Sequence, residues 1–298
     1  MNKSYNISIK YVQLCLVIVM VCFFIRCQNG EDEPDPGEPV EITFEVTDPT
    51  ETGASDGSIV TEITGGIAPF SFLWSNGAKS QNVEELQAGM YTLTVTDSHD
   101  QIAIDSVELT DVVKDADGNV YTIKKIGGQT WMKENLRVQH APDSTAITTY
   151  VYNNDTTLQN LYGRLYTWHV AMNGSVEEGA QGICPCGWHI PSDKEFKELE
   201  IYLGMTESEA NMVNVWRGSP VGQRLKAGGD SGYNAQMAGR YYASRFTLLG
   251  QWEYMWTSSE NSSNSAWRRC LDKGRSTVGR YNTFTKDYGF SVRCIKDD

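Results

Sequence analysis

Apolar and polar positions alternate with a period of two in several short stretches between residues 40 and 110. The alternation is clearest where threonines separate Tyr91, Leu93 and Val95, because successive side chains of a strand point to opposite faces. An Asn76-Gly77 pair marks a tight turn between two such stretches. We therefore predict an all-β sandwich over residues 40–110, with Trp74 packed inside it.

Helical spacing replaces this alternation after residue 191. Ser192 and Glu195 form an S-x-x-E box, in which each side chain can satisfy a free backbone amide of the first helical turn. Thr206 and Glu209 repeat the pattern as T-x-x-E. We expect two consecutive helices with these apolar or terminating residues: Phe196, Leu199, Leu203 and Gly204 in the first, and Ala210, Val213 and Trp216 in the second.

The segment Asp115–Asn119, DADGN, resembles the start of a calcium-binding loop. Such a loop needs a bidentate glutamate at its twelfth position, where this chain has Ile126. We therefore predict a hairpin turn between strands at Val112 and Val120. Large apolar residues that follow should form the core below it: Trp131, Leu136 and Trp168.

The first 27 residues have the pattern of an export signal. Lys3 and Lys10 precede an apolar run over residues 12–25, which is short for a membrane span and has the length of a signal-peptide core. The end of this run, FFIRC, resembles a bacterial lipoprotein signal in which Cys27 becomes the acylated first residue, although Arg26 stands where a small residue is usual. Cys22 is a competing acceptor, and an uncleaved anchor is the simpler alternative.

Residues 28–39 form an acidic linker. They include five acidic residues, three prolines and two glycines, a composition that stays extended and solvated. Acidic residues directly after Cys27 also resemble the surface-export signal of Bacteroidetes-type lipoproteins. We expect a protein held in the outer membrane by its N-terminal lipid and exposed on the cell surface.

The composition narrows the range of partners. The chain has 298 residues, of which 40% are hydrophobic, and this is ordinary for a protein of two globular domains. Its formal net charge is −13, and no basic stripe is visible. A nucleic acid is therefore not an expected partner, because its phosphates need such a stripe.

Five blocks of the second half resemble the Fibrobacter succinogenes major paralogous domain, the FISUMP family. They are DADGNVYTIKKIGGQTWMKENLRV (115–138), LYGRLYTW (161–168), CPCGWHIPSDKEF (184–196), YMWTSSE (254–260) and GFSVRCIKD (289–297). This resemblance implies an architecture similar to C-type lectin-like and formylglycine-generating-enzyme-type domains. We accordingly expect an α+β C-type lectin-like domain over residues 111–298, with two helices, a small curved sheet and long loops.

The first half resembles the SprB repeat. The matching features are a GG-x-x-P-F corner, a W-S-N-G turn and AG-x-Y-T-L-T-V-T-D, within residues 52–109. The family implies an immunoglobulin-like spacer on secreted or surface proteins. The expected fold is thus two-domain, with an immunoglobulin-like sandwich before the lectin-like domain.

The expected folded part contains an even number of cysteines, as is usual for an exported protein with disulfides: Cys184, Cys186, Cys270 and Cys294. Cys184 and Cys186 are too close to pair readily with each other. By similarity to the long-range bridge of lectin-like domains, we expect Cys294 to bond one of them and Cys270 the other. Pairing of Cys270 with Cys294 is the alternative. A zinc site is disfavoured, because C-x-x-C pairs are absent.

The sequence contains no recognisable catalytic motif. G-x-S-x-G, H-E-x-x-H and the phosphate-binding loop are absent, and the four histidines lie in different segments. We interpret His189, between Trp188 and Ile190, as a core residue. We therefore expect no enzymatic activity, cofactor or metal, although kinship with formylglycine-generating enzymes would suggest copper chemistry at two free thiols.

Aromatic residues, arginines and amides are concentrated between residues 216 and 267, where lectin-like folds carry binding loops. Aromatic faces with neighbouring amides suit sugars or protein side chains. The E-P-N, Q-P-D and W-N-D motifs of calcium-dependent lectins are absent. We expect Tyr254, Trp256 and Trp267 to be structural, and the ligand-binding candidates are Trp216, Tyr241, Tyr242, Arg245, Trp252, Asn261 and Asn264.

The hypothesis from the sequence is a surface lipoprotein that presents a recognition or adhesion domain on a sandwich spacer and binds a glycan or a surface protein. One alternative is a purely structural component of the cell envelope. The other is an exported enzyme with the formylglycine-generating-enzyme-type fold.

Overall fold

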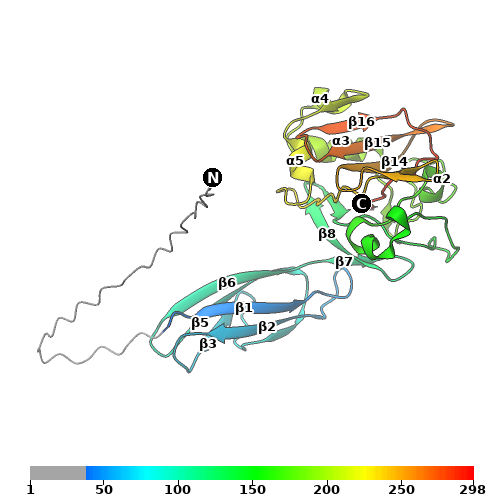
Figure 1. Ribbon diagram of the computed structural model, residues 1–298. Coiled ribbons are helices and arrows are strands. Elements are labelled where there is room, and N and C mark those ends of the chain that lie inside the picture. Colours follow the sequence, from blue (N-terminus) through cyan, green and yellow to red (C-terminus); the bar gives the residue numbers. More distant parts are fainter. Residues whose placement is uncertain (1–37) are drawn as a thin grey trace, which may run out of the picture. The chain divides into compact units, whose positions relative to one another are not determined.

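The strands before residue 110 form two antiparallel sheets around one core (Figure 1). The computed structural model describes residues 38–298, so the predicted leader and Cys27 lie outside the described residues. One sheet has the order β1-β2-β4, with bounds Glu41–Thr47, Gly57–Thr64 and Val83–Leu86. The other has the order β3-β5-β6, with bounds Ser71–Trp74, Gly89–Thr96 and Ile102–Leu109. The predicted all-β sandwich is confirmed in this coarse form.

The alternation in the sequence places the sandwich core as predicted. Leu93 and Val95 are fully buried, and Trp74 is 2% exposed, which confirms its role in packing. The Trp74 indole nitrogen donates a hydrogen bond to the Ser80 carbonyl oxygen at 3.0 Å, which satisfies its polar atom. Gly77 has a φ of 88°, a left-handed conformation that suits glycine in the turn after β3.

A hairpin opens the second half of the described chain, as predicted in place of a calcium loop. Its strands are β7 (Val112–Lys114) and β8 (Val120–Ile126). The Asp115 carboxylate accepts bonds from the backbone amides of Asp117 and Asn119 at 3.0 Å each, and from the Tyr121 hydroxyl at 2.6 Å. The carboxylate is therefore engaged in forming the turn.

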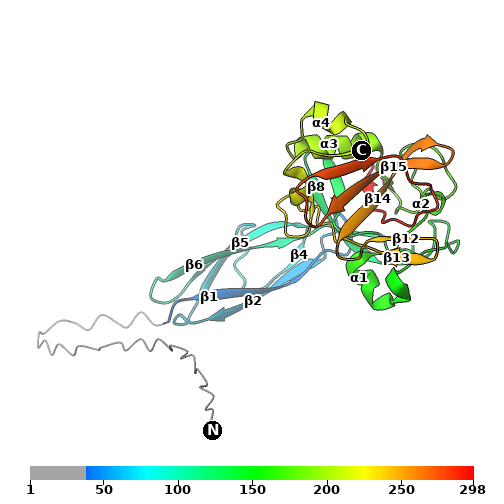
Figure 2. The same cartoon turned by 45° about the horizontal axis from the view of Figure 1, so that its top comes forward.

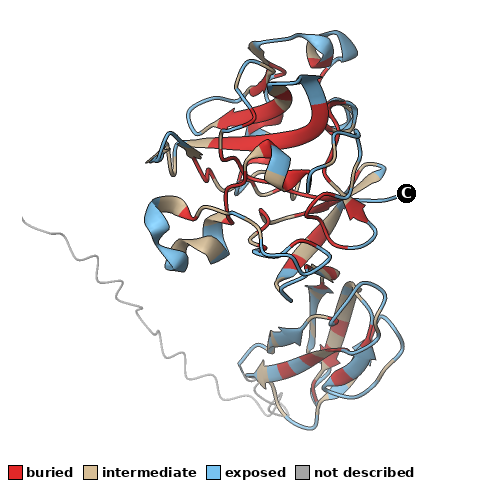
Figure 3. Cartoon of the chain, turned by 90° about the vertical axis from the view of Figure 1, so that its right-hand side faces the viewer, coloured by how far each residue is buried: buried red, intermediate tan, exposed pale blue. Residues whose placement is uncertain are grey.

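Two larger antiparallel sheets follow. The first has the order β10-β17-β9-β8-β7, in which β10 is Trp188–His189, β17 is Ile295–Lys296 and β9 is Gln129–Met132. The second has the order β11-β16-β15-β14, with bounds Val215–Arg217, Val278–Tyr281, Ser265–Asp272 and Trp252–Ser262. A separate hairpin pairs β12 (Arg240–Tyr242) with β13 (Arg245–Thr247). Buried residues follow the long curved strands of this half (Figure 3).

The helices are short. They are the 3-10 turns η1 (Tyr152–Asn154) and η2 (Thr156–Leu158), and α1 (Gln159–Tyr162), α2 (Trp168–Ala171), α3 (Asp193–Tyr202), α4 (Glu207–Asn211) and α5 (Val221–Leu225). Among residues 38–298, no helix has the length and apolar character needed to cross a membrane. The described chain is thus mostly β-sheet, and its likeness to C-type lectin-like domains stays a prediction.

Both predicted capping boxes are confirmed, at the start of α3 and of α4. The predicted apolar side of the second helix is wrong beyond Ala210. The helix ends at Asn211, Val213 is 44% exposed, and Trp216 lies in β11. Asn214 adopts a left-handed φ of 57°, which redirects the chain into the strand.

A disulfide joins Cys184 to Cys294 across 110 residues, with the Cα atoms 6.0 Å apart. It confirms that Cys294 bonds one of the two neighbouring cysteines. The predicted second bridge between Cys186 and Cys270 is wrong, because both thiols are free. Cys270 is buried in β15, opposite Tyr254, whereas Cys186 lies exposed in the loop before β10.

One face of the β11-β16-β15-β14 sheet holds a buried ionic cluster, which we call the arginine–carboxylate cluster. It consists of Asp193 and Glu200 on α3 and Arg217, Arg269 and Arg280 on the sheet. Glu200 and Arg269 are fully buried. Although burial acts to raise it, the hydrogen bonds from Arg280 and Arg269 hold the pKa of Asp193 at about 2. The cluster therefore stays ionised and ties α3 to the sheet.

Candidate functional site

The opposite face of the same sheet is aromatic. Trp252, Tyr254 and Trp256 alternate along β14, so their side chains point to one face. Tyr254 is paired with Cys270, and Trp256 with Arg268, and directly opposed residues share a face. The two faces of one sheet thus carry different chemistry, ionic toward α3 and aromatic on the other side.

Aromatic rings form a continuous row across this face. The centroid separations are 5.2 Å for Trp216–Trp252, 5.6 Å for Trp252–Tyr254, 4.9 Å for Tyr254–Phe290, 5.6 Å for Phe290–Tyr288 and 3.8 Å for Tyr288–Tyr242. Tyr254 and Phe290 in the middle are buried, whereas Tyr242 at one end is 42% exposed and Trp216 at the other is half-buried. The row therefore supports the core in its middle and reaches solvent at its ends.

The exposed end of the row belongs to the β12–β13 hairpin. Ala243 and Ser244 both adopt left-handed φ values, of 47° and 60°, which allow a two-residue turn between the strands. The turn places Tyr242 directly opposite Arg245. A cavity of about 360 Å³, which we call the hairpin pocket, is lined by Arg240, Tyr242, Ala243, Arg245, Thr247 and Tyr288.

Arg240 is held in a fixed position beside this pocket. Its guanidinium carbon lies 5.5, 5.4 and 5.6 Å from the ring centroids of Tyr254, Phe284 and Tyr288. Such contacts attract the cation to the ring faces. Its Nε also donates to Thr247 Oγ1 at 3.2 Å. The side chain is thus oriented by protein contacts before any ligand arrives.

Cys270 lies deeper on the same face. Burial raises the pKa of its thiol to about 11, despite the neighbouring Arg268. The thiol is therefore protonated at neutral pH. Arg268 itself is 3% exposed and stacks on Phe284, with its guanidinium carbon 3.7 Å from the ring centroid.

The free thiols give a direct check on the cysteine assignment. In a chain that begins at residue 38, we expect one thiol, Cys186, to react under native conditions, because Cys270 is buried. Two should react after denaturation without reductant, and four after reduction. Titration with a chromogenic disulfide reagent measures all three counts. A count of zero in the denatured, unreduced chain would contradict the structure.

The structure brings some of the predicted ligand-binding residues together and separates the others. Trp216 and Trp252 pack edge to face at one end of the aromatic row, and Tyr242 and Arg245 face each other at the other end. Tyr241 stacks on Tyr150 at 3.9 Å between the ring centroids. The hairpin thus presents Tyr242 and Arg245 as the exposed members of the aromatic and arginine candidates.

The two predicted asparagines are engaged within the chain. Asn261 donates to Ser265 Oγ at 3.0 Å and accepts from Asn282 Nδ2 at 2.9 Å. The Asn264 carbonyl oxygen accepts a bond from the Lys286 backbone amide at 2.9 Å. Both residues connect the β14–β15 turn to the segment before Tyr288.

Sequence reasoning missed four residues of the hairpin pocket, namely Arg240, Ala243, Thr247 and Tyr288. The first three had a local signal, because RYY-AS-RFT reads as two short strands around a two-residue turn. Tyr288 had none, since it reaches Tyr242 only through the folding of residues 282–290 over the sheet.

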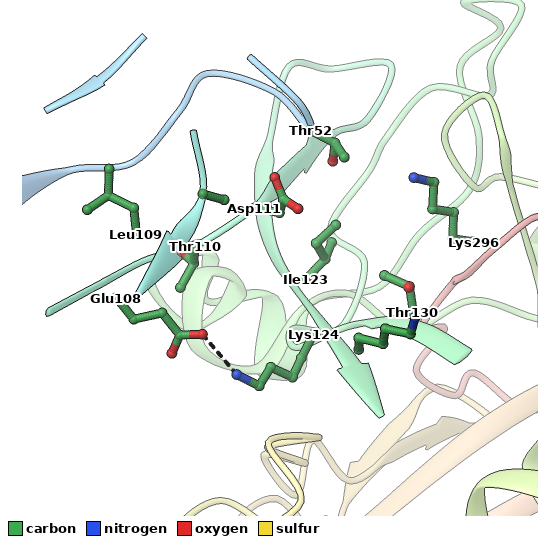
Figure 4. A pocket seen from close by; sticks show the side chains of 12 residues that line it. Thr52, Glu108, Leu109, Thr110, Asp111, Ile123, Lys124, Thr130 and Lys296 are labelled. Atoms are coloured by element: carbon green, nitrogen blue, oxygen red, sulfur yellow. Dashed lines mark hydrogen bonds and ion pairs between the residues drawn. The ribbon is translucent and has the colours of Figure 1, made fainter. Parts of the chain in front are cut away.

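Another cavity of about 360 Å³ is lined by residues that include Thr52, Glu108, Thr110, Lys124 and Lys296 (Figure 4). The Lys124 ammonium and the Glu108 carboxylate form an ion pair there at 3.0 Å. None of the predicted ligand-binding residues lines this cavity. Acidic and basic residues both line it, whereas the charged residues that line the hairpin pocket are all basic, so the hairpin pocket is the stronger candidate.

His189 is held by two carboxylates. Its Nδ1 lies 2.6 Å from Asp297 Oδ1, and its Nε2 lies 2.8 Å from Glu195 Oε1. Burial acts to lower the pKa of His189, but its hydrogen bonds to the Glu195 and Asp297 carboxylates raise it above its usual 6.5. The histidine thus links the start of α3 to the C-terminal strand.

This link predicts a pH-dependent stability. The raised pKa of His189 contributes stability that is complete below pH 6.5 and is lost as the pH rises through the folded value. The pKa of Glu195 is lowered from 4.5, against the effect of burial, so its contribution is lost as the pH falls. We expect His189→Gln to lower the free energy of unfolding by about 1 to 2 kcal/mol near pH 6, as measured by urea denaturation. The exposed His169→Gln variant is the control, and equal losses in both variants at every pH would contradict the link.

Comparisons with known proteins confirm both resemblances seen in the sequence. Residues 43–79 match the SprB repeat, and residues 125–296 match the Fibrobacter succinogenes major domain. These families suggest a surface protein of the adhesion type, outside the cell. No curated protein matched the chain.

One solved structure is similar, the C-terminal 282-residue fragment of intimin in complex with the intimin-binding domain of the translocated intimin receptor. The identity is 13%, the match covers 87% of this chain and 67% of that one, and the TM-score is 0.22, too low to support an argument. The family assignment therefore depends on the match over residues 125–296, which spans more than half of the 298 residues. The chain belongs to the Fibrobacter succinogenes major domain family.

Proposed function

We propose that this protein is a surface-displayed recognition or adhesion protein that binds a glycan or a protein partner through the hairpin pocket, without catalysis. The observation that carries the proposal is the stacked pair of Tyr242 and Tyr288, whose ring planes lie 7° apart beside two arginines. Rigid aromatic faces offer apolar contact area at little conformational cost, and guanidinium groups add directional hydrogen bonds.

The pocket is formed by segments that are fixed to each other. The backbone amide of Tyr241 donates to the Gly289 carbonyl oxygen at 2.9 Å, and the amide of Gly289 donates to the Tyr241 carbonyl oxygen at 2.7 Å. These bonds hold β12 beside the segment that carries Tyr288. A binding surface that is already ordered loses less entropy when a ligand binds.

We further propose that the N-terminal part of the chain displays the hairpin pocket away from the membrane. Acylation of Cys27 would anchor the protein in the outer membrane, and the acidic linker and sandwich would hold the second half away from the lipid. The sandwich suits a spacer because its two sheets enclose their own core. Its match to a repeat family of surface proteins supports this role.

The absence of catalysis is also part of the proposal. The enzyme alternative would use two free thiols, and Cys294 is bonded to Cys184. Cys270 is buried, and its raised pKa keeps it protonated. Neither sulfur therefore supplies a reactive thiolate in this state of the protein.

Binding of the full chain to arrays of glycans and of surface proteins tests the proposal. We expect reproducible binding to at least one class, and a loss of about tenfold in affinity for Tyr242→Ala, because that ring supplies the exposed contact face. Affinity can be measured by surface plasmon resonance against the best array hit.

Tyr202→Ala is the matched control, since Tyr202 is a tyrosine 62% exposed on α3. Figure 2 shows α3 and the β12–β13 hairpin at different ends of this half of the chain. Equal losses in the two variants would refute the pocket as the binding site. No binding to either array would favour a purely structural envelope component.

A further inference from the structure

We propose that the ligand of the hairpin pocket is an anionic polysaccharide, whose carboxylate or sulfate groups bind Arg240 and Arg245. This inference rests on the proposed function and names the chemical class of the ligand. Several other arginines in the described chain are paired with a carboxylate, and these two are not.

Five arginines of the described residues form ion pairs with carboxylates. In each pair a guanidinium nitrogen lies within 3.4 Å of a carboxylate oxygen, and the arginines are Arg217, Arg224, Arg269, Arg275 and Arg280. Within residues 38–298, neither Arg240 nor Arg245 forms an ion pair, and no acidic residue lines their pocket. This occurs in a chain with 38 acidic and 25 basic residues. The pocket is therefore a local positive site on an acidic protein, and such a site attracts anions.

The hairpin directs both arginines to the same side. Arg240 is paired with Thr247, and Tyr242 with Arg245, so the four side chains lie on one face of the two strands. Diagonal neighbours on such a face are about 7 to 8 Å apart. This spacing applies to the backbone, and the two long side chains that start from it can reach one anionic group together or two groups along one polymer chain.

The hydrogen-bonding capacity of these arginines is largely unused. The bond that Arg240 makes within the described residues uses Nε, which leaves both terminal nitrogens to donate to an oxyanion. Arg245 is exposed and makes no side-chain hydrogen bond in the same part of the chain. A planar guanidinium with two parallel donors matches a carboxylate or sulfate group.

The stacked tyrosines favour a sugar over other anions. Tyr242 and Tyr288 stack at 3.8 Å, and the partly exposed Tyr242 offers a flat apolar face at the pocket. A pyranose ring presents flat C–H faces that pack on such a surface. An anionic membrane would need a broad cluster of basic residues, whereas this pocket is lined by two, Arg240 and Arg245.

The test measures binding of the full chain to a panel of anionic polymers: polygalacturonate, alginate, hyaluronan, chondroitin sulfate and heparin. Carboxyl-reduced polygalacturonate and dextran are the neutral probes, and polyglutamate is the acidic peptide probe. We expect at least one anionic polysaccharide to bind at least tenfold more tightly than either neutral polymer. Binding should weaken as the salt concentration rises from 50 to 200 mM.

Arg245→Gln should weaken this binding by about tenfold and reduce its salt dependence, whereas Arg245→Lys should retain part of the affinity. Arg224→Gln is the control, since Arg224 is paired with Asp230 away from the pocket. Circular dichroism and urea denaturation of each variant show whether its fold is intact.

Three outcomes overturn the inference. If neutral sugars bind as tightly, and Tyr242→Ala abolishes binding while Arg245→Gln does not, the recognition function stands and the anionic class is wrong. If polyglutamate alone binds in an Arg245-dependent way, the ligand is an acidic protein. If the folded chain binds none of the polymers, the anionic polysaccharide is wrong, and the arrays described above decide separately whether the proposed function survives.

Discussion

Replacing both Cys184 and Cys294 with alanine should lower the free energy of unfolding by about 4 to 5 kcal/mol. The bridge closes a loop of 110 residues, and in the chain-entropy model a loop of about 100 residues is worth about 4.7 kcal/mol. Both residues are fully buried, so alanine leaves no unpaired thiol in the core. Denaturation with guanidinium chloride, monitored by tryptophan fluorescence, measures the loss.

Cys186→Ala is the control for this double variant. Cys186 is exposed and free, so the replacement should change the free energy of unfolding by less than about 0.5 kcal/mol. A loss below about 1 kcal/mol in the double variant would mean that the sheet contacts of β17 close the domain without the sulfur bridge. Those contacts are the pairings of β17 with β10 and β9.

The features that the sequence predicted well depend on residues that are close along the chain. Ser192 and Glu195 are three residues apart, and their reciprocal bonds form at 3.1 and 2.7 Å, as the capping box requires. The alternation around Leu93 likewise reports which side of one strand is apolar. Such local patterns contain enough information to define an element and its buried face.

The wrong predictions concern contacts between distant residues. Trp216 has the spacing of a helix face, but β11 pairs with β16, and Val215 lies opposite Arg280. That pairing across 65 residues replaces the helix, and no local pattern in the sequence indicates the pairing. The bridge between Cys186 and Cys270 failed for the same reason, because an even number of cysteines does not indicate that Cys270 points into a packed core.

In the candidate site, too, the local features were predicted and the contacts between distant residues were not. Tyr242 and Arg245 were predicted from composition, and the hairpin that aligns them is local. Tyr288 joins them from more than forty residues away, and the sequence does not show which rings of the aromatic row are buried. Aromatic content therefore located the region, and long-range packing decided which of its residues reach the pocket.

Arg269→Met should destabilise the protein by about 3 to 5 kcal/mol, because it leaves two buried carboxylates short of a partner. Arg269 donates to Asp193 and Glu200 at 2.7 Å each, and its guanidinium carbon lies 5.1 Å from the Phe196 ring centroid. A loss of this size is a large part of the 5 to about 15 kcal/mol that stabilises a typical domain. Urea denaturation at pH 7 measures it.

Two further measurements distinguish the ionic role from simple packing. Arg275→Met is the control, because Arg275 is an exposed arginine whose loss should cost less than about 1 kcal/mol.

The lowered pKa of Asp193 gives stability that is present above pH 3.8 and is lost as the pH falls toward about 2. Arg269→Met should weaken that acid dependence, since one of the two arginines that lower this pKa is gone. If the variant lost stability equally at pH 3 and pH 7, the arginine would act through its packing on Phe196 alone, and the ionic account of how α3 is held to the sheet would be wrong.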